Sequence, residues 1–220
     1  MKLSHPRAVL WDMDGTLLDS AALHWQAWAE TMAAAGHRND TDYFIATFGQ
    51  RNDTILRGLL GPRASEDEIA GLSDAKEAHY RKLVRAQGVE LFPGVRAWLA
   101  TLQAAGWRQA IASSAPRPNI ETILDVTNIA PYFGAAVSGE DVQAGKPDPQ
   151  VFLLAADRLR TPRERCVVVE DSPYGIEGAR RAGMKSVAVG TAYAALPADV
   201  AAALPADLPA DAFERLVADD

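Results

Sequence analysis

The sequence predicts an α/β protein: a doubly wound parallel sheet of the Rossmann-like kind, with an α-helical domain inserted near its start. Short apolar runs alternate with helical patterns through most of the 220 residues. Continuous apolar character in such short runs indicates strands buried on both faces, as in a parallel sheet. One long interval without a strand candidate follows the first run, and it breaks the alternation.

The strand candidates are residues 8–12 (AVLWD), 108–113 (RQAIAS), 135–138 (AAVS), 166–170 (CVVVE) and 186–189 (SVAV). Helical patterns lie at about 93–105, 116–127, 148–158 and 173–182. Strands that alternate with helices predict right-handed crossovers. The Ala/Pro/Asp-rich stretch from Ala194 to Asp211 predicts a surface connection and a weak final strand.

The interval from Ser20 to about Gln87 contains only helical patterns, at 20–35, about 41–46, 51–60 and 66–86. An insert placed directly after the first strand must fold over the carboxyl end of the sheet, where α/β folds bind their ligands. We interpret it as a cap. The predicted domains are a catalytic core of residues 1–18 and 89–220, and a helical cap domain of residues 19–88.

The composition narrows the class of protein. A formal net charge of −7 argues against a nucleic-acid partner, which needs a basic face. The single cysteine, Cys166, lies in an apolar run and suits a reducing compartment. The sequence shows no signal peptide and no apolar stretch long enough for a membrane span, so we expect a cytoplasmic protein without a membrane partner. We expect a monomer, since a closed cap needs no partner subunit.

Two acidic pairs follow strand candidates. Asp12 and Asp14 end the first strand, while Glu170 and Asp171 end the run CVVVE. Each pair could be turn and helix-cap residues instead. If the two strands are neighbours, however, their tip carboxylates converge, and dense oxygen ligands of this kind favour Mg²⁺.

Polar residues also follow the other strands. Ser113 and Ser114 end the second strand, where a hydroxyl and a backbone amide bind phosphate oxygens well. Lys146 lies in the stiff segment Gly-Lys-Pro-Asp-Pro, although a lone lysine there could equally be surface charge. With the acidic pairs, these residues supply a nucleophile, a proton-transfer group, a cation and phosphate donors. That set predicts phosphoryl transfer.

With these residues in this order, the sequence resembles the haloacid dehalogenase-like hydrolase superfamily over essentially its whole length. DMDGTL, from Asp12, is similar to the first motif and the Ser113-Ser114 pair to the second. Lys146 in GKPDP is similar to the third motif, and EDSPYGIEGARRAG to the fourth. The four motifs occur in the expected order and spacing.

The resemblance implies a role for each matched residue. Asp12 would attack phosphorus and form an aspartyl-phosphate, and Asp14 would protonate the leaving oxygen and then activate water. Mg²⁺ would be held by Asp12, the Asp14 carbonyl and Asp171, with Glu170 in support. The phosphoryl group would be held by Ser113, the Ser114 amide and Lys146. Asp14 also excludes dehalogenation, because that branch lacks an aspartate at this position.

The helical insert resembles the cap of the branch that contains β-phosphoglucomutase and many sugar-phosphate phosphatases. His24, Trp28 and Lys76 are similar to that enzyme's cap pattern, and Arg51 lies near the position of its phosphate-binding arginine, offset by one residue. The other interpretation makes His24 a packed or capping histidine, Trp28 a packing residue, and Lys76 and Arg51 surface charges.

The sequence favours a phosphatase for a small phosphorylated metabolite, with sugar phosphates first. The alternative is a sugar phosphomutase, which needs a second phosphate site. Pro116 and Pro118 lie where the mutase carries polar and basic residues, and Arg117 is left as a substitute donor. A phosphonate hydrolase that uses Lys76, or a non-catalytic binding module, would be further alternatives.

Overall fold

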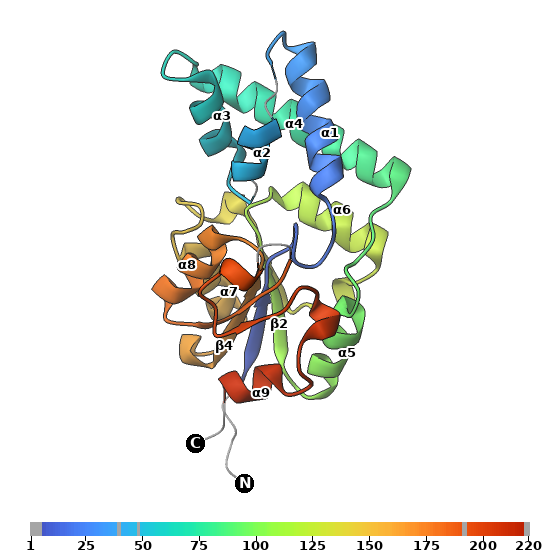
Figure 1. The fold of residues 1–220 in the computed structure, drawn as a ribbon, viewed down its shortest axis with the longest axis vertical. Helices are drawn as coiled ribbons and strands as arrows, with labels where there is room; N and C mark the ends of the chain where they lie inside the picture. The colour runs from blue at the N-terminus through green and yellow to red at the C-terminus, as the bar shows by residue number, and fades with distance from the viewer. Residues whose placement is uncertain (1–5, 39–40, 48, 191–192, 218–220) are drawn as a thin grey trace.

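A six-stranded parallel sheet forms the centre of the computed structural model, which describes residues 6–38, 41–47, 49–190 and 193–217 (Figure 1). The strand order is β3-β2-β1-β4-β5-β6. The strands are β1 (Ala8–Trp11), β2 (Arg108–Ala112), β3 (Ala135–Val137), β4 (Cys166–Glu170), β5 (Lys185–Ala188) and β6 (Val200–Ala201). The chain runs outward from β1 to β3 and returns to β4 on the other side of β1. This reversal is the switch point at which doubly wound sheets bind ligands.

Helices cover both faces of the sheet (Figure 1). Val9 and Trp11 of β1 belong to the apolar core beneath α5, α6 and α9, whereas Ala8 and Leu10 belong to the core beneath α7 and α8. This alternation explains why the strand sequence is apolar at every position. The helices are α5 (Val95–Ala104), α6 (Arg117–Thr127), α7 (Gln150–Arg158), α8 (Pro173–Ala182) and α9 (Ala212–Leu216).

The predicted elements of the core agree closely with the structure. The four predicted helices begin and end within two residues of α5, α6, α7 and α8. The weak final strand predicted within 194–211 is the two-residue β6. Helix α9 was not predicted, because five residues are too few to show a helical period. The predicted α/β fold class is confirmed.

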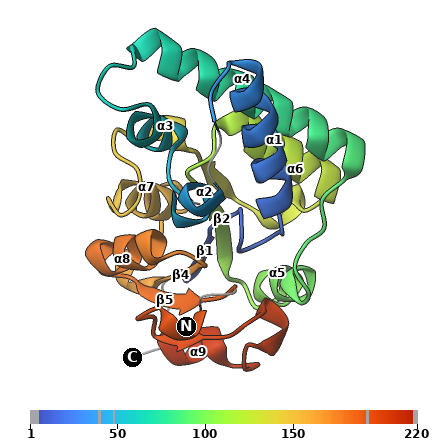
Figure 2. The same ribbon diagram turned by 45° about the horizontal axis from the view of Figure 1, so that its top comes forward.

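Four helices form a separate layer over the carboxyl ends of the strands (Figure 2). They are α1 (Ala21–Ala34), α2 (Thr41–Thr47), α3 (Asn52–Leu60) and α4 (Glu66–Gln87). Their shared apolar core consists of Trp28, Met32, Ile55, Leu56, Ile69 and Leu72. Helix α4 packs along α1 and also reaches α6 of the sheet layer. The inserted helical cap is therefore confirmed, while its limits at 19 and 88 stay a prediction.

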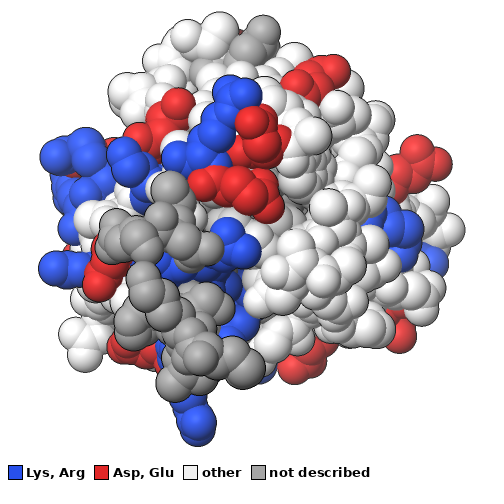
Figure 3. Space-filling view, turned by 90° about the horizontal axis from the view of Figure 1, so that it is seen from below, with Lys and Arg blue, Asp and Glu red and all other residues white. Residues whose placement is uncertain are grey.

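Charged side chains are spread over the end of the molecule opposite the cap. Lys and Arg side chains gather mainly on one side of that face, with Asp and Glu side chains among them (Figure 3). Exposed Arg180 and Arg181 on α8 both pair with Glu177, as expected of a solvated helix face. Among the described residues, no helix is both long and apolar enough to cross a membrane.

Candidate active site

Three carboxylates gather where β1 and β4 end. Asp12 follows β1, while Glu170 ends β4 and is followed by Asp171, and the two strands are parallel neighbours. One carboxylate oxygen from each residue lies within 4.8 Å of the others. Lys146 Nζ lies 2.5 Å from Asp12 Oδ1 and 2.6 Å from Glu170 Oε1. The structure thus brings Asp12, Lys146 and Asp171 together at adjacent strand tips.

The end of β4 is held rigidly by its own side chains. Glu170 Oε2 accepts hydrogen bonds from the amides of Asp171 and Ser172 and from the Ser172 hydroxyl. Ser172 Oγ in turn accepts from the Gly175 amide and caps α8. A Cβ at Gly175 would lie 1.8 Å from the Glu170 carboxyl carbon, so this turn requires glycine.

Asp171 is positioned by residues that follow β1. Thr16 Oγ1 donates to Asp171 Oδ1 at 3.2 Å. Gly15 has a φ of +86°, and a Cβ there would lie 2.1 Å from Asp171 Oδ2. The glycine of DMDGTL is therefore needed both for the left-handed turn and for the close approach of this carboxylate.

The acidic cluster has less positive charge than negative charge. Burial raises the pKa of Asp12 well above its usual range, and Glu170 and Asp171 add to this, although Lys146 opposes it. Burial, with Glu170 beside it, raises the pKa of Asp171 to about 8. Burial would lower the pKa of Lys146, but Asp12 and Glu170 outweigh it and raise that pKa, so the side chain is an ammonium. Three carboxylates with one ammonium leave a formal excess of two negative charges.

This excess, the hard oxygen donors and the close approach of Asp171 that Gly15 permits fit a divalent cation such as Mg²⁺. The Asp14 side chain is not a member of the cluster, because it turns toward the cap. We therefore describe the tips of β1 and β4 as an acidic cluster suited to a divalent metal.

A cavity of about 470 Å³ separates this cluster from the cap. Asp12, Ser113 and Ser114 line its floor, and residues of α3 and α4 line its roof. Ser113 is buried at the end of β2, and its Oγ accepts the Ala115 amide at 3.0 Å. The volume suits a small-molecule ligand.

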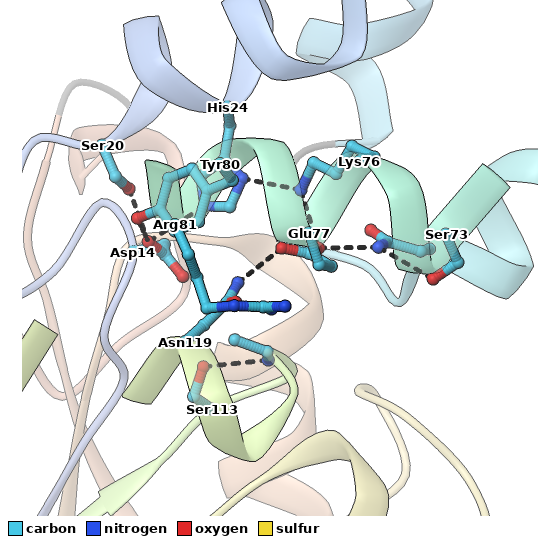
Figure 4. Close-up of polar contacts among 12 residues, drawn as sticks. Asp14, Ser20, His24, Ser73, Lys76, Glu77, Tyr80, Arg81, Ser113 and Asn119 are labelled. Atoms are coloured by element: carbon cyan, nitrogen blue, oxygen red, sulfur yellow. Dashed lines mark hydrogen bonds and ion pairs between the residues drawn. The ribbon is translucent and has the colours of Figure 1, made fainter. Parts of the chain in front are cut away.

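Asp14 is held by donors from the cap (Figure 4). Its Oδ1 lies 2.6 Å from Ser20 Oγ, 3.1 Å from His24 Nε2 and 3.3 Å from Tyr80 Oη. The His24 and Tyr80 rings stack with centroids 3.8 Å apart. Burial would raise the pKa of Asp14, but His24 and Ser20 outweigh it and hold that pKa below its usual value.

Two further residues of α4 extend this network toward the sheet layer (Figure 4). Lys76 Nζ lies 2.8 Å from His24 Nδ1 and 2.7 Å from Glu77 Oε1. Asn119 of α6 donates to Glu77 and accepts from Arg81 Nη1 at 2.9 Å. The cap and the sheet layer are thus joined by polar contacts beside the cavity.

The two remaining predicted arginines differ in position. Arg51 lines the cavity and also reaches the sheet layer, donating to the Gly139 carbonyl at 2.9 Å. Arg117 pairs with Asp141 at 2.5 Å and does not appear among the described residues that line the cavity. Cys166 is buried at the far end of β4, and burial raises the pKa of its thiol to about 12.

Residues 6–183 match the family model of the haloacid dehalogenase-like hydrolases. The chain belongs to this family. Within the haloacid dehalogenase-like hydrolases, it is 33% identical to protein CbbY of Rhodobacter capsulatus over 85% of this chain and 86% of that protein. It is 32% identical to phosphoglycolate phosphatase of Salmonella paratyphi A over 87% of this chain and 84% of that protein.

A solved structure of β-phosphoglucomutase from Clostridium difficile shares the fold, with a TM-score of 0.87 at 22% identity. It covers 96% of this chain and 97% of its own. The family membership makes this protein a hydrolase of the haloacid dehalogenase-like type, and its curated relatives include phosphatases.

Sequence reasoning did not single out Ser20, Tyr80, Glu77, Arg81 or Asn119. A signal was present on α4, because Lys76, Glu77, Tyr80 and Arg81 follow one another at helical spacing and share one face. Their partners on α1 and α6 depend on tertiary packing, which the spacing does not reveal.

Proposed function

We propose that this hydrolase is a Mg²⁺-dependent phosphatase that cleaves a small phosphorylated metabolite through an aspartyl-phosphate, with sugar phosphates as the first candidates. The observation that carries the proposal is the placement of Asp12 on the floor of the cavity, 2.5 Å from the Lys146 ammonium and within the acidic cluster. The phosphoglycolate phosphatases among its relatives support the reaction type.

The proposed reaction has two halves. An Asp12 carboxylate oxygen attacks phosphorus, and the ester oxygen leaves with a proton from Asp14. Asp14, now a carboxylate, then takes a proton from water as that water attacks phosphorus, which releases phosphate and restores Asp12. The donors from Ser20 and His24 stabilise the carboxylate form of Asp14 that the second half requires, so Asp14 has to take up a proton before the first half begins. Lys146, Ser113 and the Ser114 amide would hold the phosphoryl oxygens.

The proposed metal ligands are Asp12, the Asp14 backbone carbonyl and Asp171, with Glu170 in support. When bound, Mg²⁺ would offset the negative charge of the carboxylates and of the phosphate. It would also lower the pKa of Asp12, so that the nucleophile is ionised at neutral pH.

The second candidate function is a sugar phosphomutase, supported by the contacts from Lys76 to His24 and from His24 to Asp14. The surroundings of α6 favour the phosphatase. Pro116 and Pro118 line the cavity there, and the Arg117 guanidinium is paired with Asp141. A mutase converts β-glucose 1-phosphate to glucose 6-phosphate in the presence of a bisphosphate primer, whereas a phosphatase releases phosphate.

The test is phosphate release from a panel of esters with Mg²⁺, by the wild type and by Asp12→Asn. The amide is nearly isosteric but not nucleophilic, so turnover should be abolished while circular dichroism and the melting temperature show a folded protein. Unchanged activity of Asp12→Asn would rule out the nucleophile. Conversion to glucose 6-phosphate without free phosphate would favour the mutase.

A further inference from the structure

Glu77 is a buried carboxylate at the junction of the cap, the sheet layer and the cavity. It is 6% exposed. Its Oε1 accepts from Asn52 Nδ2 at 2.6 Å and from Lys76 Nζ at 2.7 Å, and its Oε2 accepts from Asn119 Nδ2 at 2.5 Å. Burial would raise the pKa of Glu77, but Lys76 and His24 outweigh it and hold that pKa below its usual value. The site therefore keeps a negative charge beside the ligand space.

Lys76 is the most buried cation of the cavity roof, with 2% of its surface exposed. Its ammonium contacts Glu77 Oε1 and His24 Nδ1. An ammonium carries three N–H donors, so two of them already have acceptors. The Lys76 ammonium thus faces the cavity as part of an ion pair with Glu77 that has no net charge.

Arg51, a second cation of the roof, is also engaged. Its Nε donates to Asp53 Oδ1 at 3.2 Å. Its Nη1 donates to the Gly139 and Val142 carbonyls at 2.9 and 3.2 Å. This arginine joins α3 to the sheet layer and has a carboxylate partner of its own.

In the part of the cavity away from the acidic cluster, Lys76 and Arg51 are therefore already paired with carboxylates. Among the described residues that line this part, carboxylates outnumber cations: Asp53, Asp74, Glu77 and Glu140 against Arg51, Lys76 and Arg81. The same wall carries neutral donors and acceptors on Asn52 and Ser73. Hydroxyl groups both donate and accept, so they match such a surface, whereas a second anion meets like charge.

We propose that this cavity selects phosphate monoesters whose remaining part is uncharged and hydroxylated, and that Glu77 determines this specificity by keeping Lys76 in an ion pair. The inference rests on the proposed phosphatase function and specifies its substrate class. A second phosphate or a carboxylate on the substrate is rejected, because the lysine that would bind it is already neutralised.

Arg81 is the residue that would support the opposite specificity. It lines the cavity, and its Nη1 donates to the neutral Asn119 Oδ1. If Arg81 binds an anionic group, esters with a second charge become the better substrates and this preference depends on Arg81.

The test compares kcat/KM within pairs of esters matched in carbon chain and different in charge. The pairs are 2-hydroxyethyl phosphate with phosphoglycolate, and glucose 6-phosphate with 6-phosphogluconate. The wild type should favour the uncharged member of whichever pair it turns over by about tenfold or more. Turnover of no ester at all would refute the phosphatase proposal, whereas preference for the charged members would overturn only the specificity inference.

Variants then assign the effect to Glu77. Glu77→Gln should reduce the preference about tenfold, by raising kcat/KM for the charged member relative to the uncharged one, because Lys76 is no longer neutralised. The double variant Lys76→Met/Glu77→Gln should lose this gain. Asp67→Asn is the control for loss of one charge, because Asp67 is an exposed carboxylate on the same helix. This variant should keep the wild-type ratio of kcat/KM between the two members of a pair.

Two results would overturn the role of Glu77. One is an equal loss of kcat/KM for both members of a pair in folded Glu77→Gln, which would leave Glu77 a structural residue only. The other is a preference for charged esters that Arg81→Gln abolishes, which would assign an anion site to Arg81. The wild-type comparison remains decisive even if Glu77→Gln fails to fold.

Discussion

Gly15 illustrates how one residue determines the acidic cluster. Gly15→Ala would force a left-handed backbone on an alanine and place its Cβ against the Asp171 carboxylate, at 2.1 Å in the present geometry. We expect Mg²⁺ affinity or kcat/KM to fall by about 10–100-fold, as when groups that orient a metal ligand are lost. A Mg²⁺ titration of activity measures this.

Gly36→Ala is the matched control. Gly36 also has a left-handed φ, +77°, but a Cβ there meets nothing within 4 Å. This variant should share the backbone cost of roughly 1–2 kcal/mol and keep its activity. Equal kinetics for both variants would show that the contact with Asp171 is unimportant.

Asp14 is the proposed general acid and base. Asp14→Ala should slow turnover by about 10²–10⁴-fold, because it removes the proposed acid and base. Tyr80→Phe is the comparison, since it deletes the longest of the contacts to Asp14, 3.3 Å, and keeps the stacked ring beside His24. A kcat of Asp14→Ala within threefold of the wild-type value, from steady-state kinetics, would reject the acid and base role of Asp14.

Serine side chains cap the N-termini of α4 and α8 and stabilise these helices. Ser65 caps α4 through the Glu68 amide, and Ser172 caps α8 through the Gly175 amide. Replacing either serine by alanine should cost about 0.5–2 kcal/mol of stability. Only Ser172→Ala should also lower kcat, because the Ser172 hydroxyl holds Glu170 at 3.0 Å. Urea unfolding and kinetics on both variants separate these effects, and an unchanged kcat for Ser172→Ala would contradict the second one.

The elements also show what sequence reasoning reached and where it stopped. The apolar run CVVVE and its acidic end predicted β4 and its carboxylates, because burial on both faces leaves a clear local pattern. The partners of Glu77 could not be predicted in this way. Asn52, Lys76 and Asn119 lie on three different helices, and they meet only through the packing of α4 against α3 and against α6.

At the scale of the whole molecule, the cap has an apolar core of its own, while Leu23 and Ala27 of α1 and Leu83 and Val84 of α4 belong to the core of the sheet layer. Polar contacts join the two layers beside the cavity. Those contacts include Arg51 with Gly139 and Glu77 with Asn119. The cap is therefore held to the sheet layer by apolar packing as well as by polar contacts.

The carboxylates of the acidic cluster should make the stability of the entire protein depend on pH. Unfolded aspartates titrate near pH ~4. In the metal-free fold the pKa of Asp12 is raised, and that of Asp171 is raised to about 8. Between these values the folded state binds more protons than the unfolded state, so the free energy of unfolding falls as the pH rises through this window.

Mg²⁺ replaces those protons, and its stabilising effect should therefore be larger at pH 8 than at about pH 5.5. With Mg²⁺ at about 100 times its Kd at pH 8, the melting temperature should rise by about 5–10 °C. Differential scanning calorimetry at both pH values, with and without MgCl₂, measures the two shifts. Asp171→Asn should lose most of the shift at pH 8, and an equal shift at both pH values would show that protons and metal do not compete for these carboxylates.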